Sequence, residues 1–581
     1  MVTICRILLN GIKIIKVAFE TSNDLIAYLI HIMKIKGRAK YCLLLFLVAF
    51  FVLGISPITK AQTIPVGITP VDELLRDLQL QGKISINHSL TTRPFFTSKI
   101  LRTDSLLHLI DSTYNFSSTI YSNNKNTWVE ALPAAANFRY NSHSPFGTNH
   151  PGFMDAKGLQ SYITGGVFAK WGILSIQLKP EFVYANNPNF EKGNGYGADT
   201  KPNYSRAFLG QSSVRISAGG ISVGVSNENL WWGPGIQNAL IMSNNAPGFS
   251  HLVLNTTKPL KTPIGNFEFS LIAGKLIEDT SVLLEVKDLT TFYYAQGNYA
   301  GNPANRILDT GDWRYLNAFH ASFTPKWIPG LYLGFNRVGY VYHTYTGNRN
   351  NFIYDYLPVF AGFFRSTSNY YTVTGSSTRI KQLISVTGRY VFKEAHAELY
   401  AEYGSNDNTY NLRDFIMSPN HGSISTVGFK KMVPIVNNKW LDIQMEFTQL
   451  AMSVDYVVRG TGNTYEYQGS YTNQSRVIGA GIGNGSNMQT LQLTMKNGFN
   501  KQGITFQRIV HDALREPNLS NHERWIDFAI GAQYQKRFKQ FLVHGHTQYV
   551  NVSNYGWMPK QNRTNIYAYA GVTYFFNRGK K

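Results

Sequence analysis

Polar and apolar residues alternate with a period of two along most of the chain, from about Ala134 onward. Residues 441–448 read Leu-Asp-Ile-Gln-Met-Glu-Phe-Thr, and residues 397–403 and 491–496 follow the same alternation. A period of two places successive side chains on opposite faces of an extended strand. The pattern therefore predicts many strands, each with one apolar face and one face that carries carboxylates and amides.

Two architectures share such strands: a soluble antiparallel sheet with one wet face, and a membrane barrel with lipid outside and a polar lumen. Carboxylates in mid-strand favour the barrel, because a water-filled lumen accommodates charge. The last candidate strand, Thr564–Phe576, resembles the aromatic-ended closing strand of outer-membrane barrels, although residues 577–581 follow it. At roughly 25 residues per strand with its loop, the roughly 450 residues after Ala134 predict about 16–18 antiparallel strands.

We predict three regions: a leader at residues 1–61, an N-terminal helical region at 62–130 and an all-β transmembrane barrel at 131–581. Within the second region, residues 69–82 combine an N-cap threonine, a proline at the first helical position, leucines at helical spacing and a final glycine. Residues 103–110 repeat this pattern of polar start and apolar spacing. Two short helices are therefore expected before the strands begin.

The leader has the organisation of a secretion signal. Residues 33–40 are basic, residues 41–55 are apolar but too short for a comfortable membrane span, and cleavage is expected after Ala61. We infer that residues 33–61 are the signal peptide and that Met33 is the true start. Amino-terminal sequencing of the precursor tests this hypothesis, and a peptide that begins within residues 1–32 contradicts it.

The cysteine content and the net charge limit which chemical groups the protein can bind. Both cysteines, Cys5 and Cys42, lie in the leader, so the mature chain cannot form a disulfide or a cysteine-ligated zinc site. The 581-residue chain has a net charge of +21; without the leader, 47 basic and 32 acidic residues remain, a net charge of +15. This surplus favours an anionic partner, either an acidic polysaccharide or the phosphates of lipopolysaccharide, and secretion argues against nucleic acid. No cofactor is expected.

The densest chemical signal is the segment Ser226–Phe249. It combines one carboxylate, two adjacent indoles, a Gly-Pro-Gly turn and several amides. Flat apolar faces beside hydrogen-bonding groups suit the recognition of sugars. The alternative is that the indoles belong to an aromatic belt and the amides satisfy a folded loop. The candidate polysaccharide-binding residues are Glu228, Asn229, Trp231, Trp232, Asn244 and Asn245.

The same segment resembles the signature of the Wzi-like capsule assembly proteins. The likeness is carried by Glu228-Asn229, by Trp231-Trp232-Gly233-Pro234-Gly235 and by Ser243-Asn244-Asn245-Ala246-Pro247. This resemblance implies an outer-membrane barrel of eighteen strands, a periplasmic helical plug at the N-terminus, and a lectin-like role in holding capsular polysaccharide at the cell surface. Tyr400-Ala401-Glu402, Ser418–His421 and Arg476–Gly479 also resemble segments of that family.

Other charged and glycine-rich stretches have structural interpretations. A lumen charge network is expected, in preference to direct ligand contact, for Glu398, Glu402, Glu446, Arg459 and Arg476. The glycine-rich run after Arg476 precedes a strand rather than a helix, which favours a turn or a close chain approach over a phosphate site. His544 and His546 share one strand face, which fits lumen-facing polar residues better than a metal pair.

These observations favour a non-enzymatic outer-membrane barrel that binds capsular or other surface polysaccharide and supports capsule assembly or attachment. The first alternative is a porin or transporter for anionic or sugar solutes. The second is an outer-membrane hydrolase, because residues 220–224 match Gly-x-Ser-x-Gly. That motif requires a strand-to-helix elbow, and no helical pattern follows Gly224, so we expect Ser222 in mid-strand.

Overall fold

The structure is a computed structural model. It describes residues 62–67, 71–96, 103–111, 117–124, 126–154, 156–186, 203–277, 313–343, 356–361, 380–406, 423–436, 439–451, 471–474, 476–483, 485–511 and 523–577. The leader, the Ser418–His421 segment and Arg459 lie outside these residues.

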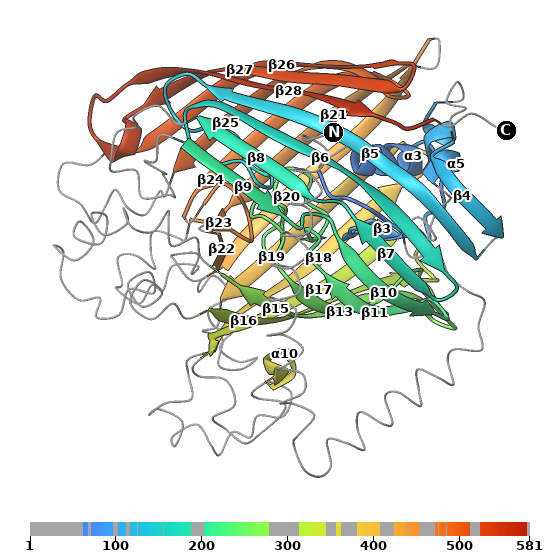
Figure 1. Ribbon diagram of the computed structural model, residues 1–581. Coiled ribbons are helices and arrows are strands. Elements are labelled where there is room, and N and C mark those ends of the chain that lie inside the picture. Colours follow the sequence, from blue (N-terminus) through green and yellow to red (C-terminus); the bar gives the residue numbers. More distant parts are fainter. Residues whose placement is uncertain are drawn as a thin grey trace, which may run out of the picture. The chain divides into compact units, whose positions relative to one another are not determined.

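One large antiparallel sheet forms the wall of the molecule and closes on itself (Figure 1). It closes because the last strand, β28, pairs with β5, with Ala570 opposite Phe138. Three wall strands are interrupted, so that β7 with β8, β9 with β10, and β13 with β14 each occupy one position in the wall. Within the described residues the wall therefore contains eighteen strands, which confirms the predicted barrel and the upper end of the predicted range.

The strands of the wall, in chain order, are β5 Thr127–Asn141, β6 Gly158–Trp171, β7 Leu174–Leu178, β8 Glu181–Asn186, β9 Asn203–Phe208, β10 Ser213–Ala218, β11 Ile221–Ser226, β13 His251–Thr256, β14 Leu260–Thr262, β15 Gly265–Leu276, β16 Arg314–Pro325, β17 Leu331–Tyr342, β18 Lys381–Phe392, β19 Ala397–Asn406, β20 Ser423–Ile435, β21 Lys439–Gln449, β24 Asn487–Asn497, β25 Asn500–His511, β26 Trp525–Phe538, β27 Phe541–Ser553 and β28 Arg563–Tyr574. The shorter elements are β1 Thr63–Ile64, α3 Val71–Leu80, β2 Thr92–Arg93, β3 Phe95–Phe96, α5 Thr103–Ile110, β4 Thr119–Asn124, β12 Trp231–Trp232, α10 Pro358–Ala361, β22 Thr472–Asn473, β23 Arg476–Val477 and η5 Tyr555–Trp557.

The alternation of side chains is inverted relative to a soluble protein. In β21 the polar residues Asp442 and Glu446 are buried in the lumen, whereas Met445 and Phe447 are 36% and 49% exposed on the outer surface. The same inversion holds in β28, where Ile566 is exposed outward and Asn565 is buried. An apolar exterior around a polar interior is the arrangement that a lipid bilayer requires.

The two ends of the barrel differ in their connections. At one end the strands are joined by two to five residues, at 172–173, 219–220, 263–264, 326–330, 393–396, 436–438, 498–499 and 539–540. At the other end every connection has nine residues or more. Short turns face the periplasm and long loops face the outside in bacterial barrels, so the short-turn end is the periplasmic end.

The N-terminal helices lie at the short-turn end (Figure 1). Asp77 of α3 forms ion pairs of 2.7 Å with both Lys430 and Lys496 on the inner wall, and both lysines also pair with Asp442. The apolar side of α3, including Leu75, packs in one cluster with Phe499 of a periplasmic turn and with Leu542 of β27. The helical region is thus bonded inside the periplasmic mouth of the barrel.

The two expected helices are present, and Gly82 follows the first with a left-handed φ of 74°. The short strands β1, β2 and β3 between or before them were not expected. They form because residues 92–96 adopt an extended course and pair with β12 and β1 rather than with each other. None of the helices in the described ranges is long and apolar enough to cross a membrane.

Candidate functional site

Residues 227–250 connect β11 to β13, which are neighbours in the wall, but they contact the opposite wall. Glu446 of β21 accepts hydrogen bonds from the backbone N–H groups of Ile236 at 2.7 Å, Gln237 at 3.0 Å and Asn238 at 2.8 Å. Glu402 of β19 accepts another from Leu240 at 3.1 Å. We call residues 227–250 the lumen loop, because they cross the interior of the barrel and are bound on its far side.

The Gly-Pro-Gly turn makes this crossing sterically feasible. Gly233 has a φ of 119°, and a Cβ atom there would lie 2.7 Å from the carboxylate of Glu402. A Cβ atom at Gly235 would lie 1.7 Å from the carbonyl oxygen of Asn238. A side chain at either position would therefore collide with the loop or its anchor. Between them, the Pro234 carbonyl accepts a hydrogen bond from Arg76 of α3 at 2.5 Å.

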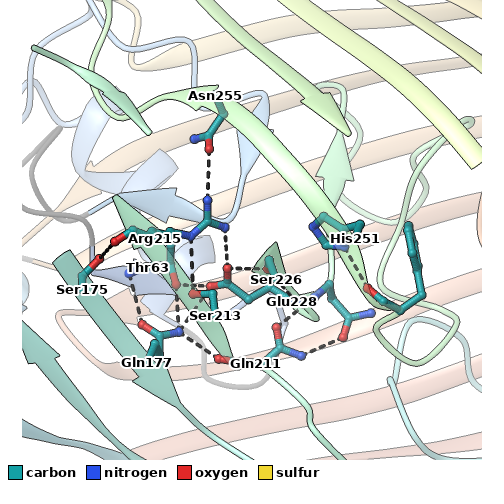
Figure 2. Close-up of polar contacts among 12 residues, drawn as sticks. Thr63, Ser175, Gln177, Gln211, Ser213, Arg215, Ser226, Glu228, His251 and Asn255 are labelled. Carbon is teal, nitrogen blue, oxygen red and sulfur yellow. Dashed lines mark hydrogen bonds and ion pairs between the residues drawn. The ribbon is translucent and has the colours of Figure 1, made fainter. Parts of the chain in front are cut away.

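Glu228 is the centre of a buried polar network at the base of the lumen loop (Figure 2). Its carboxylate pairs with Arg215 of β10 at 2.7 Å and accepts hydrogen bonds from Ser226 at 2.8 Å and from the Thr63 hydroxyl. Gln177 of β7 donates to the same carboxylate at 3.3 Å. The network joins three separate parts of the chain: the N-terminal segment, the wall and the loop.

The charge of Glu228 is stabilised in this network. Burial on its own raises the pKa of a carboxyl group, but the Arg215 guanidinium and the hydrogen bonds from Thr63, Arg215 and Ser226 outweigh it. The pKa of Glu228 therefore lies below its ordinary value, and the group is an ionised anchor. A catalytic acid would need the opposite shift.

The three candidate asparagines bond to the protein itself. Asn229 and Gln211 form a two-way pair at 3.0 and 2.7 Å, and Asn229 also donates to the Ala246 carbonyl at 2.7 Å. Asn245 accepts from the backbone N–H of Asn149 at 3.2 Å and donates to the Val477 carbonyl at 3.1 Å. Asn244 donates to the Asn149 carbonyl at 3.1 Å. Asn244 and Asn245 thereby tie the lumen loop to the loop that follows β5 and to β23.

Trp231 and Trp232 form β12, which pairs with β2 of the N-terminal region. The Trp231 indole N–H donates to the Gly235 carbonyl at 3.1 Å, and the Arg93 guanidinium lies 5.1 Å from its ring centroid. Trp232 stacks on His320 of β16 with 5.5 Å between the ring centroids. Both indoles are buried, so their faces are covered by protein.

The structure thus brings all six candidate residues together in the lumen loop and buries all of them. Direct contact with a sugar stays a prediction, because it requires the loop to open. The residues that sequence reasoning missed are the partners, chiefly Arg215, Gln211 and Arg93. The alternation of β10 indicates that Arg215 faces inward, but Gln211 and Arg93 lie outside the wall strands, and nothing in the sequence indicates which loop residue each of the three meets.

The expected lumen charge network is present in part. Glu398 is ion-paired with Arg389 and, at 2.6 Å, with Arg76 of α3. Glu402 and Glu446 instead bind backbone N–H groups of the lumen loop. The remaining member within the described residues, Arg476, is buried in β23.

The glycine-rich run shows the close chain approach that was expected. A Cβ atom at Gly481 would lie 2.5 Å from the side-chain oxygen of Asn245. Ser222 is buried as the second residue of β11 and pairs with Ser217 on one side and Asn255 on the other, so it lies within a strand and not on a strand-to-helix elbow. His546 faces the lumen beside Tyr567, with 6.0 Å between the ring centroids.

Comparison with known proteins agrees with this geometry. The sequence family described as capsule assembly protein Wzi matches residues 141–565. Among solved structures, the chain is similar to one from Escherichia coli described as Wzi, an outer membrane protein involved in group 1 capsule assembly that is a carbohydrate-binding β-barrel. The two share 11% identity and a TM-score of 0.56, over 89% of this chain and 100% of that chain.

More distant likenesses extend to other barrels. Acinetobacter baumannii OccAB4 matches with 8% identity and a TM-score of 0.36, over 78% of this chain and 99% of its own. Pseudomonas aeruginosa OpdQ matches with 9% identity and the same TM-score, over 77% and 97%. Likenesses at this level carry no argument about function. No curated protein matches the chain.

Proposed function

The chain belongs to the capsule assembly protein Wzi family, and from that premise we propose that it binds capsular or other surface polysaccharide at the outer membrane and supports capsule assembly or attachment. The solved relative is described as a carbohydrate-binding barrel. The net charge of +15 without the leader favours an acidic polymer. In this proposal the protein acts by binding and not by catalysis.

The observation that supports a role for the lumen loop is its free hydrogen-bonding capacity. Among the described residues, the Trp232 indole N–H and the side-chain oxygens of Asn238 and Asn244 are buried without a hydrogen-bond partner. Buried polar atoms without partners are costly, about 1–3 kcal/mol each, and require an explanation. We propose that hydroxyl groups of the polymer bond to these atoms when the loop opens.

Glu228, Asn229, Trp231 and Asn245 complete the proposed site. Glu228 bonds to the wall and to the N-terminal segment, Asn229 bonds to Gln211, and Asn245 bonds to β23. These bonds would hold both ends of the loop in place when it opens. Preorganisation of this kind reduces the entropic cost of binding a flexible polymer. In the opened loop the Trp pair would also offer flat apolar faces to sugar rings.

A polysaccharide pull-down tests the site. Trp232→Ala is expected to reduce retention of the purified barrel on immobilised capsular polysaccharide by roughly tenfold, which corresponds to the loss of about 1.4 kcal/mol of binding free energy. Trp327→Ala is the matched control, because Trp327 is 63% exposed on a periplasmic turn. Heat-modified gel mobility verifies that both variants fold.

Equal retention of the folded Trp232→Ala variant and the wild type would contradict the site. If the variant does not fold, Asn244→Ala replaces it, since that change removes one amide and leaves the apolar packing intact. Gene deletion tests the function itself: capsule is expected in the medium with its synthesis intact. An unchanged amount of cell-bound capsule would contradict the proposed function.

The porin alternative receives less support, because the lumen loop crosses the interior and bonds to the far wall. Liposome swelling measures it directly. Rapid swelling with small sugars in the wild type would favour the porin over the polysaccharide-binding barrel.

A further inference from the structure

A continuous apolar row crosses five strands on the outer surface of the barrel. The register places Met445 of β21 opposite Leu491, Leu491 opposite Phe506, Phe506 opposite Ile530, and Ile530 opposite Tyr549 of β27. Four of the five side chains are at least 36% exposed on the membrane-facing side. This row is the upper part of the apolar band, counted from the periplasmic end.

The next outward row, two residues closer to the long loops, is mixed: three of its five residues are polar and two are phenylalanines. It contains Phe447, Gln489, Arg508, Phe528 and Asn551, again opposite one another in register. Arg508 donates to the Gln489 side chain at 3.0 Å, and its guanidinium lies 5.7 Å from the Phe528 ring centroid. Arg508 forms no ion pair within the described part of the chain.

The two rows border one shallow groove of about 540 Å³. Most of its lining surface is apolar, and the polar residues that line it include Arg508 and Asn551, which belong to the row nearer the long loops. This volume lies in the range of ligand-sized pockets, about 300–1,000 Å³. Because β25 ends at His511, Arg508 lies only three residues below the extracellular end of its strand. The groove therefore opens into the outer leaflet.

We propose that this groove binds one phosphorylated glycolipid of the outer leaflet, with an acyl chain along the apolar row and a phosphate on Arg508. The apolar row buries methylene groups at about 0.8 kcal/mol each. The guanidinium offers a fork of N–H donors that fits a phosphate, and Gln489 and Phe528 hold it in place. Arg508 thereby obtains an anionic partner at the depth where a phosphate headgroup lies.

The competing account is that Arg508 only extends toward interfacial water, as membrane-facing arginines do. In that case any lipid would occupy the groove and the phosphate would not matter. The two accounts differ in their dependence on the charge of the headgroup, and this difference can be measured. The inference goes beyond polysaccharide binding and does not depend on it.

Native mass spectrometry of the detergent-purified protein measures the glycolipid bound per barrel. Wild-type protein is titrated with lipid A and with chemically dephosphorylated lipid A. Tighter binding of the phosphorylated form is expected, and Arg508→Gln is expected to lower its affinity roughly tenfold, since a charge-assisted hydrogen bond contributes about 1.5–3 kcal/mol. Arg508→Lys is expected to retain part of the affinity.

Lys536→Gln is the matched control. Lys536 lies on β26, with its ammonium 5.3 Å from the Phe538 ring centroid, at the periplasmic end of the same surface. That variant is expected to bind as the wild type does. A Leu491→Trp variant, which fills the groove, is expected to weaken both lipid forms equally.

Equal affinity of the wild type for the two lipid forms would overturn the proposal, and so would equal losses in Arg508→Gln and Lys536→Gln. The comparison of the two lipids on wild-type protein decides the question even if a variant fails to fold. Polysaccharide retention by Arg508→Gln is expected to be unchanged, so that failure of this site and failure of the proposed function give different results.

Discussion

At the scale of single residues, the Arg215–Glu228 pair is a buried ionic anchor of the lumen loop. Both side chains are buried, and their charges are compensated mainly by each other. Removal of one partner from such a pair leaves an uncompensated charge and costs about 3–5 kcal/mol. The sequence points to Glu228 because it lies in a dense motif, whereas Arg215 occurs in an ordinary alternating strand and has no such signal.

Arg215→Met is therefore expected to destabilise the barrel by about 3–5 kcal/mol, measured by guanidinium unfolding in detergent with tryptophan fluorescence. Arg537→Met is the comparison, because the pair of Arg537 with Asp111 is partly exposed. That change is expected to cost less than Arg215→Met does, because water screens a pair that it partly reaches. Equal losses of stability in the two variants would contradict the view that burial makes the Arg215–Glu228 pair the more costly one to break.

Acid is expected to weaken the same network. The folded pKa of Glu228 is depressed by Arg215 and the neighbouring hydroxyls, although burial opposes them. A depressed carboxyl pKa contributes stability that is present above the unfolded value and is lost as the pH falls through the folded value. Glu228→Gln is expected to flatten the decline of stability below about pH 4.5 in the same unfolding measurement.

His150 adds a second pH dependence at higher pH. Burial, followed by the charges of Arg139, His546 and His544, lowers the pKa of His150 to about 3. The imidazole stays neutral in the folded protein while the unfolded chain takes up a proton below about pH 6.5, so stability falls as the pH is lowered from 6.5 toward 3. His150→Asn is expected to reduce this slope. His143→Asn, an exposed change in the same loop, is the control, and equal slopes in all three proteins would refute the assignment.

At the scale of elements, the lumen loop illustrates what a sequence can and cannot predict. Its composition identifies it, and its Gly-Pro-Gly turn predicts a sharp course. Its path across the barrel depends on Glu446 and Glu402, which follow more than 150 residues later. Alternation indicates that these carboxylates face the lumen. Pairing between inward side chains and a distant loop has no period, and therefore leaves no sequence pattern.

Glu446→Ala is expected to loosen the lumen loop, because three backbone N–H groups lose their acceptor at about 1–3 kcal/mol each. Conductance across planar bilayers is expected to rise above that of the wild type. Gln533→Ala, which removes another inward polar side chain, is expected to leave conductance unchanged. A folded Glu446→Ala barrel with wild-type conductance would argue against the loop as the constriction.

The helix α3 shows the same limit of prediction. Its capping residues and leucine spacing indicate a helix, and the structure contains it at Val71–Leu80. Its partners Lys430 and Lys496 come from strands far along the chain, and only the folded barrel brings both to Asp77. The sequence shows these charged residues, but it does not indicate that they pair with one another.

At the scale of the whole molecule, the alternation and the length of the chain predicted the architecture well. They led to a closed antiparallel barrel and a narrow range of strand numbers, because lipid outside and water inside impose one pattern on every strand. The interruptions at β7–β8, β9–β10 and β13–β14 were not foreseen. Each half strand keeps the ordinary alternation of polar and apolar residues. An interruption is visible only in how the half strands pair with their neighbours, which the sequence does not indicate.

A charged side chain on the lipid-facing surface of the barrel is expected to destabilise the fold most near the middle of the membrane. Val386 lies in the middle of β18 and is 52% exposed to lipid. Val386→Arg is expected to cost about 2–4 kcal/mol of folding free energy in lipid vesicles. Val436→Arg, in a periplasmic turn, is the control with an expected cost near zero. A cost at Val386 no larger than at Val436 would contradict the bilayer position assigned to this band.

The pairing of the last strand with the first has a consequence for biogenesis. In a nascent chain that lacks β28, the edges of β27 and β5 carry unpaired backbone N–H and C=O groups. The hydrocarbon of a bilayer offers these groups no hydrogen-bond partner. The contacts of β2 with β12 place an N-terminal stretch inside the cylinder as well. The whole chain must therefore be exported before the barrel can insert and close. The N-terminal helical region must enter the barrel before β28 pairs with β5.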